Sequence, residues 1–335
     1  MSVLGEHMEA DMRAQPEVLR ALRSQPRPEL GPQPDGIVIV ARGSSDYAAI
    51  FGRYLLEAVT GRPVALAAPS LQTLYGVEPR LEGWLAVGIS QSGRTPEIRT
   101  VLDAYGSAGA RTLAITNDPG SPLARAADWS LALGAGDEAA VPATKTFTAQ
   151  LAALALVAEA LGPVPWDGGD WERVPAAVES VLGDFGAAER AAARLDGAEE
   201  LVALGRGYLM PVALEAALKL REAARLRAEG WSAADFRHGP VTVLGPDLPV
   251  LAVSAAGPAA ADVEELGRDV AASGAVVLRI ADDASADLAY PGDLPEPLRA
   301  LPATVRAQQL ALAVARRRGL DPDSPPGLRK VTPTR

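Results

Sequence analysis

The two halves of this 335-residue chain repeat one another. Three apolar runs in the first half have counterparts in the second, and each run ends at a glycine, a serine or an aspartate. The matched ends are Gly43 and Gly207, Ser90 and Ser254, and Asp118 and Asp283. Because the separation within the pairs is nearly constant, the pattern indicates a duplicated domain.

Each matched run is short and rich in β-branched residues, and helix-like sequence follows it, as at 47–59 and 212–228. This alternation is typical of a parallel sheet with helices on both faces. The sequence therefore predicts an α/β fold of two tandem domains, each a flavodoxin-like parallel sheet flanked by helices.

The length suits two domains of roughly 150 residues each. We expect a docking helix at 8–24, a connector at 162–170, a helix at 175–193 and a proline-containing tail without regular helix. The predicted parts are an N-terminal helix with a proline-rich lead-in at 1–34, a first domain at 35–165, a second domain at 190–320 and a C-terminal tail at 321–335.

Composition excludes several classes of protein. No run reaches the roughly 20 apolar residues that cross a bilayer, and the N-terminal residues are acidic, so we expect a soluble, cytoplasmic protein without membrane contacts. The absence of cysteine excludes disulfides, thiolate metal sites and cysteine nucleophiles. A net charge of −10 opposes binding to nucleic acid. Without a metal-ligand cluster or a dinucleotide fingerprint, we expect no metal and no cofactor.

Lysine is rare in this chain. Lysine and arginine together number 32, and the lysines are Lys145, Lys219 and Lys330. An arginine-rich composition explains the bias itself, but an amine can lose its proton or form an imine, which a guanidinium cannot do. The three positions are therefore candidates for chemistry, although the place of Lys145 before the apolar helix 148–161 favours a structural role.

In open parallel sheets, ligands bind beyond the carboxyl ends of the strands. Three such loops in the first half are rich in small polar residues, at 43–46, 90–95 and 116–121. In the second loop, Thr95 and Pro96 are typical of an N-cap and a first helical position, where free N–H groups suit a phosphate. Turn formation alone could explain one such loop. The second half, however, has Ser-Ala-Ala-Gly at 254–257, and the loss of hydroxyls there favours a ligand in the first half.

Seven motifs together resemble the sugar isomerase (SIS) family, and specifically the isomerase part of glutamine–fructose-6-phosphate aminotransferases and the stand-alone glucosamine-6-phosphate deaminases. The resemblance runs from about residue 35 to the C-terminus. The motifs are Arg42-Gly-Ser-Ser45, Ser90-Gln-Ser-Gly-Arg-Thr95, Thr116-Asn117, Glu138 through Thr144-Lys-Thr-Phe147, Leu214-Glu-Ala-Ala-Leu-Lys-Leu-Arg-Glu222, His238-Gly-Pro240 and Leu328-Arg-Lys330.

The resemblance implies roles for individual residues. The phosphate would be bound by Ser90, Gln91, Ser92 and Thr95, and the sugar would face Gly43, Ser44, Ser45 and Val141. Glu222 would move a proton between C1 and C2, and His238 would help to open the ring from a second subunit. Lys219 would lie beside the open sugar, and Lys330 would engage its carbonyl end while the tail closes the active site.

The residue types agree with these roles. A carboxylate within reach of both carbons can move the proton, and Glu222 can share a helix face with Lys219, three residues earlier. A solvated ion pair is the ordinary explanation of such a spacing, but the apolar neighbours Leu214 and Leu218 indicate a partly buried helix. A lone histidine such as His238 is more often structural, yet the Gly-Pro that follows would present its ring, and imidazole exchanges protons near neutral pH.

The leading hypothesis is conversion of glucosamine-6-phosphate to fructose-6-phosphate and ammonia. The family's synthases hydrolyse glutamine with a cysteine nucleophile, which this sequence lacks, so we expect no glutamine hydrolysis. The alternatives are a deglycase that splits a fructosamine-6-phosphate adduct and a non-catalytic sensor of sugar phosphates. We also expect a homodimer, because His238 would act across an interface and the apolar face at 8–22 needs a surface to cover it.

Overall fold

The computed structural model describes residues 3–328 and residue 330. The chain divides into two compact units. The first-sheet unit holds Glu17–Asp137, Lys145–Asp167 and Lys330, and the second-sheet unit holds the residues up to Pro16, Glu138–Thr144 and Gly168–Leu328. The short segment Glu138–Thr144 thus belongs with the second sheet, although it lies inside the range 35–165 of the first predicted domain.

Five parallel strands form the sheet of the first-sheet unit, in the order β2-β1-β3-β4-β5. The strands are β1 (Ile37–Val40), β2 (Val64–Leu66), β3 (Leu85–Ile89), β4 (Arg111–Thr116) and β5 (Trp129–Ala132). The helices are α2 (Gln15–Arg23), which enters this unit at Glu17, α3 (Ser44–Thr60), α4 (Ser70–Thr73), α5 (Pro96–Ser107), α6 (Pro122–Ala126) and α7 (Lys145–Leu161).

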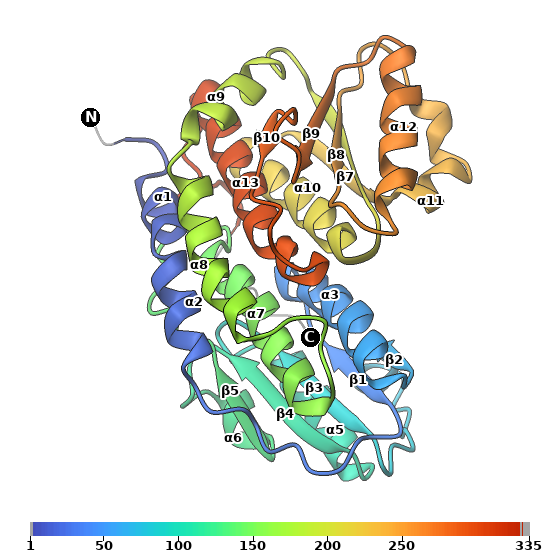
Figure 1. Ribbon diagram of the computed structural model, residues 1–335. Helices are drawn as coiled ribbons and strands as arrows, with labels where there is room; N and C mark the ends of the chain where they lie inside the picture. The colour runs from blue at the N-terminus through green and yellow to red at the C-terminus, as the bar shows by residue number, and fades with distance from the viewer. Residues whose placement is uncertain (1–2, 329, 331–335) are drawn as a thin grey trace. The chain divides into compact units, whose positions relative to one another are not determined.

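Helices cover both faces of this sheet, with α3 and α7 along one face and α5 and α6 along the other (Figure 1). Alternate residues of a strand point to opposite faces, and Val38 and Val40 of β1 pack on the α5 side with Val101 and Leu102. Because neither face is left to solvent, β1 and β3 are buried along their whole length.

The second-sheet unit repeats this plan with the order β10-β9-β8-β6-β7. Its strands are β6 (Glu200–Gly205), β7 (Arg227–Ser232), β8 (Val250–Val253), β9 (Val277–Ala281) and β10 (Leu288–Ala289). Its helices are α1 (Glu6–Arg13), α8 (Gly168–Leu182), α9 (Phe185–Ala193), α10 (Met210–Ala224), α11 (Ala233–Arg237), α12 (Ala260–Ala272) and α13 (Glu296–Arg317), with short 3₁₀ turns at Gly207–Leu209 and Pro240–Val243. Read from β7, the strand order equals that of the first sheet, which confirms the predicted pair of parallel α/β domains.

The helix predicted at 212–228 is shorter at its C-terminal end. α10 ends at Ala224, where Arg225 adopts a left-handed conformation with φ 50° and the amide of Leu226 bonds back to Leu220 O at 3.2 Å. The chain then enters β7, in which Ala228 is buried. The prediction was wrong here because Arg227–Ser232 carries few β-branched residues, and pairing with β6 decides its conformation.

Two other predicted helices are interrupted. The segment 175–193 holds the end of α8 and all of α9, because Asp184 caps a new helix by accepting a hydrogen bond from the amide of Ala187 at 3.2 Å. The segment 8–24 is divided between α1 and α2 at Ala14. Its Met8 and Met12 are buried within the chain, so this apolar face gives no reason to expect a partner subunit.

Two predicted boundaries are shifted: α8 begins at Gly168, inside the connector predicted at 162–170, and the helix predicted at 148–161 begins at Lys145 as α7. From Leu320 to Leu328 the tail has no helix, as predicted, while 331–335 lie outside the described residues. In the described part of the chain, no helix is both long enough and apolar enough to cross a membrane.

Candidate functional site

The order β2-β1-β3-β4-β5 places a topological switch point between β1 and β3, where the connections leave to opposite sides. Ligands of such sheets bind beyond the carboxyl ends of these two strands. The loop after β3, residues 90–95, and the turn after β1, residues 43–45, therefore lie at one end of one sheet. The sequence predicted both as substrate-binding segments.

Several polar groups of the β3 loop (90–95) form hydrogen bonds within the loop. The Ser90 and Thr95 hydroxyls share a hydrogen bond of 3.3 Å, and Ser92 Oγ accepts the amide of Arg94 at 3.2 Å. Thr95 occupies the N-cap position of α5, as predicted, but its side chain makes no capping bond. Within the described residues, the backbone amides of Gln91 and Ser92 donate to no protein acceptor. Free amides and hydroxyls in one short loop are suited to an anion.

Gly93 is required at the bend of this loop. Its φ is +61°, a left-handed conformation that favours glycine. A Cβ at this position would also lie 2.1 Å from Ser121 Oγ and 2.7 Å from Thr116 Oγ1. The loop can therefore pack against the hydroxyl-rich segment after β4 when residue 93 has no side chain.

The turn after β1 brings a second group of predicted residues to the start of α3. Gly43 is the N-cap residue, with φ 60° and open space around the position of a Cβ. Ser44 is half-buried and Ser45 is buried. The hydroxyl of Ser45 accepts a hydrogen bond of 2.9 Å from Gln150 Nε2 of α7, which fixes its rotamer.

An ion pair that sequence reasoning did not single out joins these two segments. Arg42, after β1, donates two hydrogen bonds of 2.9 Å to Glu97 in the first turn of α5. Glu97 has 6% of its surface exposed. Burial raises the pKa of nearby Asp46, and the charge of Arg42 opposes that rise. The bidentate contact holds the β1 turn to the helix that follows the β3 loop.

In the second-sheet unit, the predicted catalytic pair shares one face of α10. Lys219 Nζ donates a hydrogen bond to Glu222 Oε2 and lies 3.4 Å from Glu215 Oε1. The Lys219 and Glu215 side chains are 0% exposed, whereas Glu222 keeps 19% of its side chain accessible. Burial alone lowers the pKa of Lys219, but the charges of Glu215 and Glu222 raise it above the usual value. The amine is therefore a buried cation that holds the Glu222 side chain by a hydrogen bond.

Glu215 was named in the sequence only as part of a motif. Its position four residues before Lys219 puts it on the same helix face, a spacing that can be recognised in the sequence. Sequence spacing does not show, however, that a second carboxylate is completely buried beside the ammonium. Burial is decided by how α10 packs between its own sheet and α13.

The other predicted residues come from other segments of the chain. His238 ends α11 and is exposed, and the chain turns at Gly239 with φ 139°. Val141 is half-buried in the segment Glu138–Thr144, which the buried Glu138 stabilises by accepting the amide of Thr144 at 2.7 Å. Lys330 is half-buried and belongs to the first-sheet unit, and its neighbours 329 and 331–335 lie outside the described residues.

Lys145 has the structural position that the sequence favoured. It begins α7, is 7% exposed, and its Nζ donates a hydrogen bond of 2.7 Å to Asp137 O. Among the described residues, no group of three or more histidine, aspartate or glutamate side chains is placed to hold a metal ion.

Comparison with known proteins agrees with this fold. The SIS domain model matches residues 33–160 and 195–308. The glutamine–fructose-6-phosphate aminotransferase of Methanothermobacter thermautotrophicus is 34% identical over 303 residues, covering 88% of this chain and 51% of that protein. The same enzyme of Shouchella clausii is 35% identical over 306 residues, with the same coverage. The chain thus spans about half the length of these curated relatives.

Two solved structures are similar over nearly the whole chain. The C-terminal domain of glucosamine-fructose-6-phosphate aminotransferase from Francisella tularensis has a TM-score of 0.84 at 25% identity, covering 96% of this chain and 98% of that one. Glucosamine-6-phosphate deaminase from Thermotoga maritima has a TM-score of 0.80 at 25% identity, covering 98% of this chain and 100% of that one.

Proposed function

Because the chain belongs to the SIS domain family, we propose that it acts on a phosphosugar and converts glucosamine-6-phosphate to fructose-6-phosphate and ammonia. The similarity to a deaminase over 98% of this chain and 100% of that one supports this direction of the reaction. The observation that carries the proposal is the carboxylate of Glu222, which is held by a buried cation and yet remains partly accessible.

In this proposal the β3 loop binds the phosphate. The amides of Gln91 and Ser92 and the hydroxyls of Ser90 and Thr95 supply neutral donors, which an otherwise acidic chain needs for an anionic substrate. Gly43, Ser44 and Ser45 lie at the neighbouring strand end and face the sugar, and Val141 contributes an apolar contact.

Glu222 then acts as the base that moves the proton. In the open-chain sugar it takes the proton from C2 and returns it to C1, so that the electron pair passes through an enolamine. The aldehyde oxygen gains a proton and the amine nitrogen loses one, which leaves a hydroxyl at C1 and an imine at C2. Water hydrolyses this imine to the ketone and releases ammonia, which balances the reaction. Lys219 positions Glu222 through the hydrogen bond and ion pair between their side chains.

His238 and Lys330 complete the proposed site. His238 assists ring opening by transferring a proton near neutral pH, and Lys330 engages the carbonyl end of the open sugar. We propose that His238 is supplied by a second copy of the chain, so the enzyme would be a homodimer. Light scattering on a preparation that is fully active as a monomer would refute this shared site.

The decisive assay is ammonia release from glucosamine-6-phosphate by the wild type and by Glu222→Gln. A general base contributes about 10²–10⁴-fold to a rate, so the variant should lose activity by at least that lower factor. Its affinity for fructose-6-phosphate, measured by calorimetry, should be unchanged. Glu199→Gln is the matched control, since Glu199 is 83% exposed, and it should retain full activity.

Other outcomes would redirect the proposal. If the wild type binds fructose-6-phosphate but releases no ammonia, the deaminase assignment is wrong. A test with a fructosamine-6-phosphate adduct then separates a deglycase, which splits it, from a non-catalytic sensor, which does not. If Glu222→Gln keeps full ammonia release, the carboxylate is not the base.

A further inference from the structure

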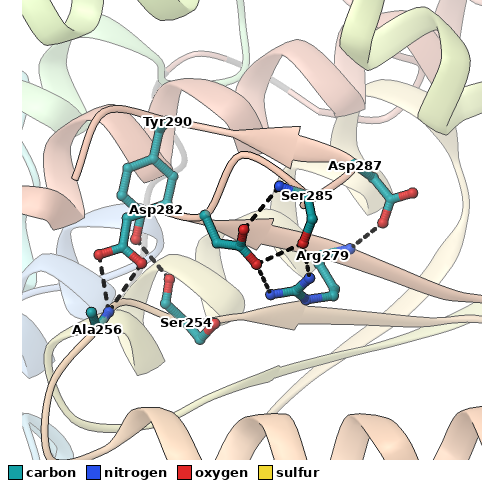
Figure 2. A network of polar contacts seen from close by, with 8 residues as sticks. Ser254, Ala256, Arg279, Asp282, Ser285, Asp287 and Tyr290 are labelled. Atoms are coloured by element: carbon teal, nitrogen blue, oxygen red, sulfur yellow. Dashed lines mark hydrogen bonds and ion pairs between the residues drawn. The ribbon is translucent and has the colours of Figure 1, made fainter.

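The second sheet has its own version of the β3 loop. The β8 loop (254–257) follows β8 at the carboxyl end of the strand, as the β3 loop follows β3. The β8 loop differs from the β3 loop in that the backbone N–H of Ala256 has an acceptor. It donates to the Asp282 carboxylate, 3.0 Å from each oxygen (Figure 2). By position after the serine that starts each loop, Ala256 corresponds to Ser92, whose amide has no protein acceptor among the described residues.

The correspondence between the halves is confirmed by their geometry. Asp118 after β4 and Asp283 after β9 each accept the amide of the residue two positions later, at 2.8 Å from Gly120 and 2.9 Å from Ser285. Since these two turns are equivalent, the residues before them are equivalent as well. Asp282 in the second half therefore stands where the first half has an asparagine.

That asparagine does not occupy the β3 loop. Asn117 Nδ2 donates to Gly136 O at 2.7 Å, and its Oδ1 accepts the amide of Ala135 at 2.8 Å. Its side chain is thus committed to the segment after β5. The replacement of a neutral amide by a carboxylate coincides with the filling of the loop.

A guanidinium completes the surroundings of Asp282. Arg299 Nη1 donates to Asp282 Oδ2 at 2.6 Å and to Ala256 O at 2.7 Å. The side chains of Asp282 and Arg299 are 9% and 15% exposed. Tyr290 also holds the loop, because its buried hydroxyl donates a hydrogen bond to Ser254 O at 2.6 Å (Figure 2). An amide donor and a guanidinium around two carboxylate oxygens are the donor set that binds an oxyanion.

A second carboxylate lies against the same loop. Glu296, in the first turn of α13, is so close to Gly257 that a Cβ there would lie 2.3 Å from its Oε2. With Asp282 present, two carboxylates face one guanidinium at this loop. An external phosphate would meet net negative charge as well as an occupied amide.

We propose that the β8 loop is a second oxyanion site, of the phosphate and sulfate class, which the carboxylate of Asp282 fills from within the chain. Its consequence, that each chain binds one phosphosugar and not two, rests on the function proposed for the β3 loop. The occupancy of the β8 loop by Asp282 is independent of that function.

The test is rescue by an anion. Asp282→Ala removes the acceptor of the Ala256 amide and the carboxylate partner of Arg299, which keeps its bond to Ala256 O. The variant should therefore melt below the wild type in chloride. Added inorganic phosphate, at matched ionic strength, should raise its melting temperature by more than it raises that of the wild type, because bound ligand stabilises the folded state. Adding Glu296→Gln to the variant should increase this response further.

Asp283→Ala is the matched control. It removes the same charge from the neighbouring position, but its partners are Ser285 and Arg279 and not the loop. Its response to phosphate should equal that of the wild type. A folded Asp282→Ala protein whose response also equals that of the wild type would overturn the proposal.

Two further outcomes are covered. If Asp282→Ala does not fold, an NMR titration of the wild type with phosphate is used in its place. The chemical shift of the Ala256 amide should then stay constant, and a change in it would refute an occupied loop. If the wild type shows no response to phosphate, the function proposed for the β3 loop fails. The difference in phosphate response between Asp282→Ala and the wild type still tests the β8 loop.

Discussion

Replacing Lys219 with methionine tests whether the buried ion pair of α10 is as important for stability as its geometry implies. Methionine has a similar length and keeps the packing, but it leaves Glu215, with a 0% exposed side chain, and Glu222 without their cation. Breaking a buried ion pair by removing one partner costs about 3–5 kcal/mol. For a unit of this size, this corresponds to a melting temperature lower by roughly 10 °C.

The pH dependence has a definite sign. The pKa of Lys219 is raised in the folded protein above the usual 10.5, so its stabilising effect is complete below pH 10.5 and is lost as the pH rises through the folded value. At pH 7 the difference between wild type and Lys219→Met should therefore be at its full size. It should shrink in strong alkali, where the wild type loses the same charge.

The assay is thermal unfolding followed by circular dichroism, with two comparison proteins. Adding Glu215→Gln to Lys219→Met neutralises the fully buried carboxylate and should restore part of the loss. Lys145→Met removes a buried lysine whose Nζ bonds to a backbone carbonyl, and should cost about 1–3 kcal/mol. A loss below about 1 kcal/mol for Lys219→Met, or no recovery in the double variant, would refute a buried cation shared by two carboxylates.

Three further predictions follow from backbone and side-chain geometry. Gly93→Ala should abolish phosphate binding and destabilise the protein by about 1–3 kcal/mol in urea unfolding, because its Cβ would meet Ser121 Oγ at 2.1 Å. Gly43→Ala is the control, since Gly43 has a similar φ but open space around the Cβ position, and it should cost about 1 kcal/mol. Arg225→Gly should raise stability by about 1 kcal/mol, since the residue has φ 50° at the end of α10; an unchanged urea midpoint would contradict this. The pKa of Asp283 should be about 2 by NMR titration, because the amide and hydroxyl of Ser285 and the side chain of Arg279 bind its carboxylate. The ionised Asp283 carboxylate therefore stabilises the folded protein above pH 3.8, the usual pKa of the group, and this effect is lost as the pH falls toward 2.

The repeat made the fold predictable. A duplicated pattern of β-branched runs and helical segments leaves few architectures open, and both sheets have the strand order expected of a flavodoxin-like domain. The errors are local. The segment after Ala224 was assigned to a helix because its composition resembles one, but hydrogen bonding to β6 makes Arg227–Ser232 a strand.

For the candidate site, the sequence predicted the loops and the residue types. The hydroxyls and the glycine at 90–95, and the spacing of Lys219 and Glu222, are visible without coordinates because they follow from strand ends and helix periodicity. The partners of these residues are not visible. Arg42 and Glu97 are 55 positions apart, and their pairing depends on the neighbouring positions of β1 and β3 in the sheet.

The clearest division concerns the two loops of the repeat. The sequence by itself determined that both halves keep a loop after the third strand and that the second loop has lost its hydroxyls. Only the tertiary structure decided what replaced them, since Asp282 and Arg299 come from the end of β9 and from α13 and meet at the β8 loop through folding. Local pattern follows from the order of residues, but the occupant of an anion site depends on charges that the chain brings together from a distance.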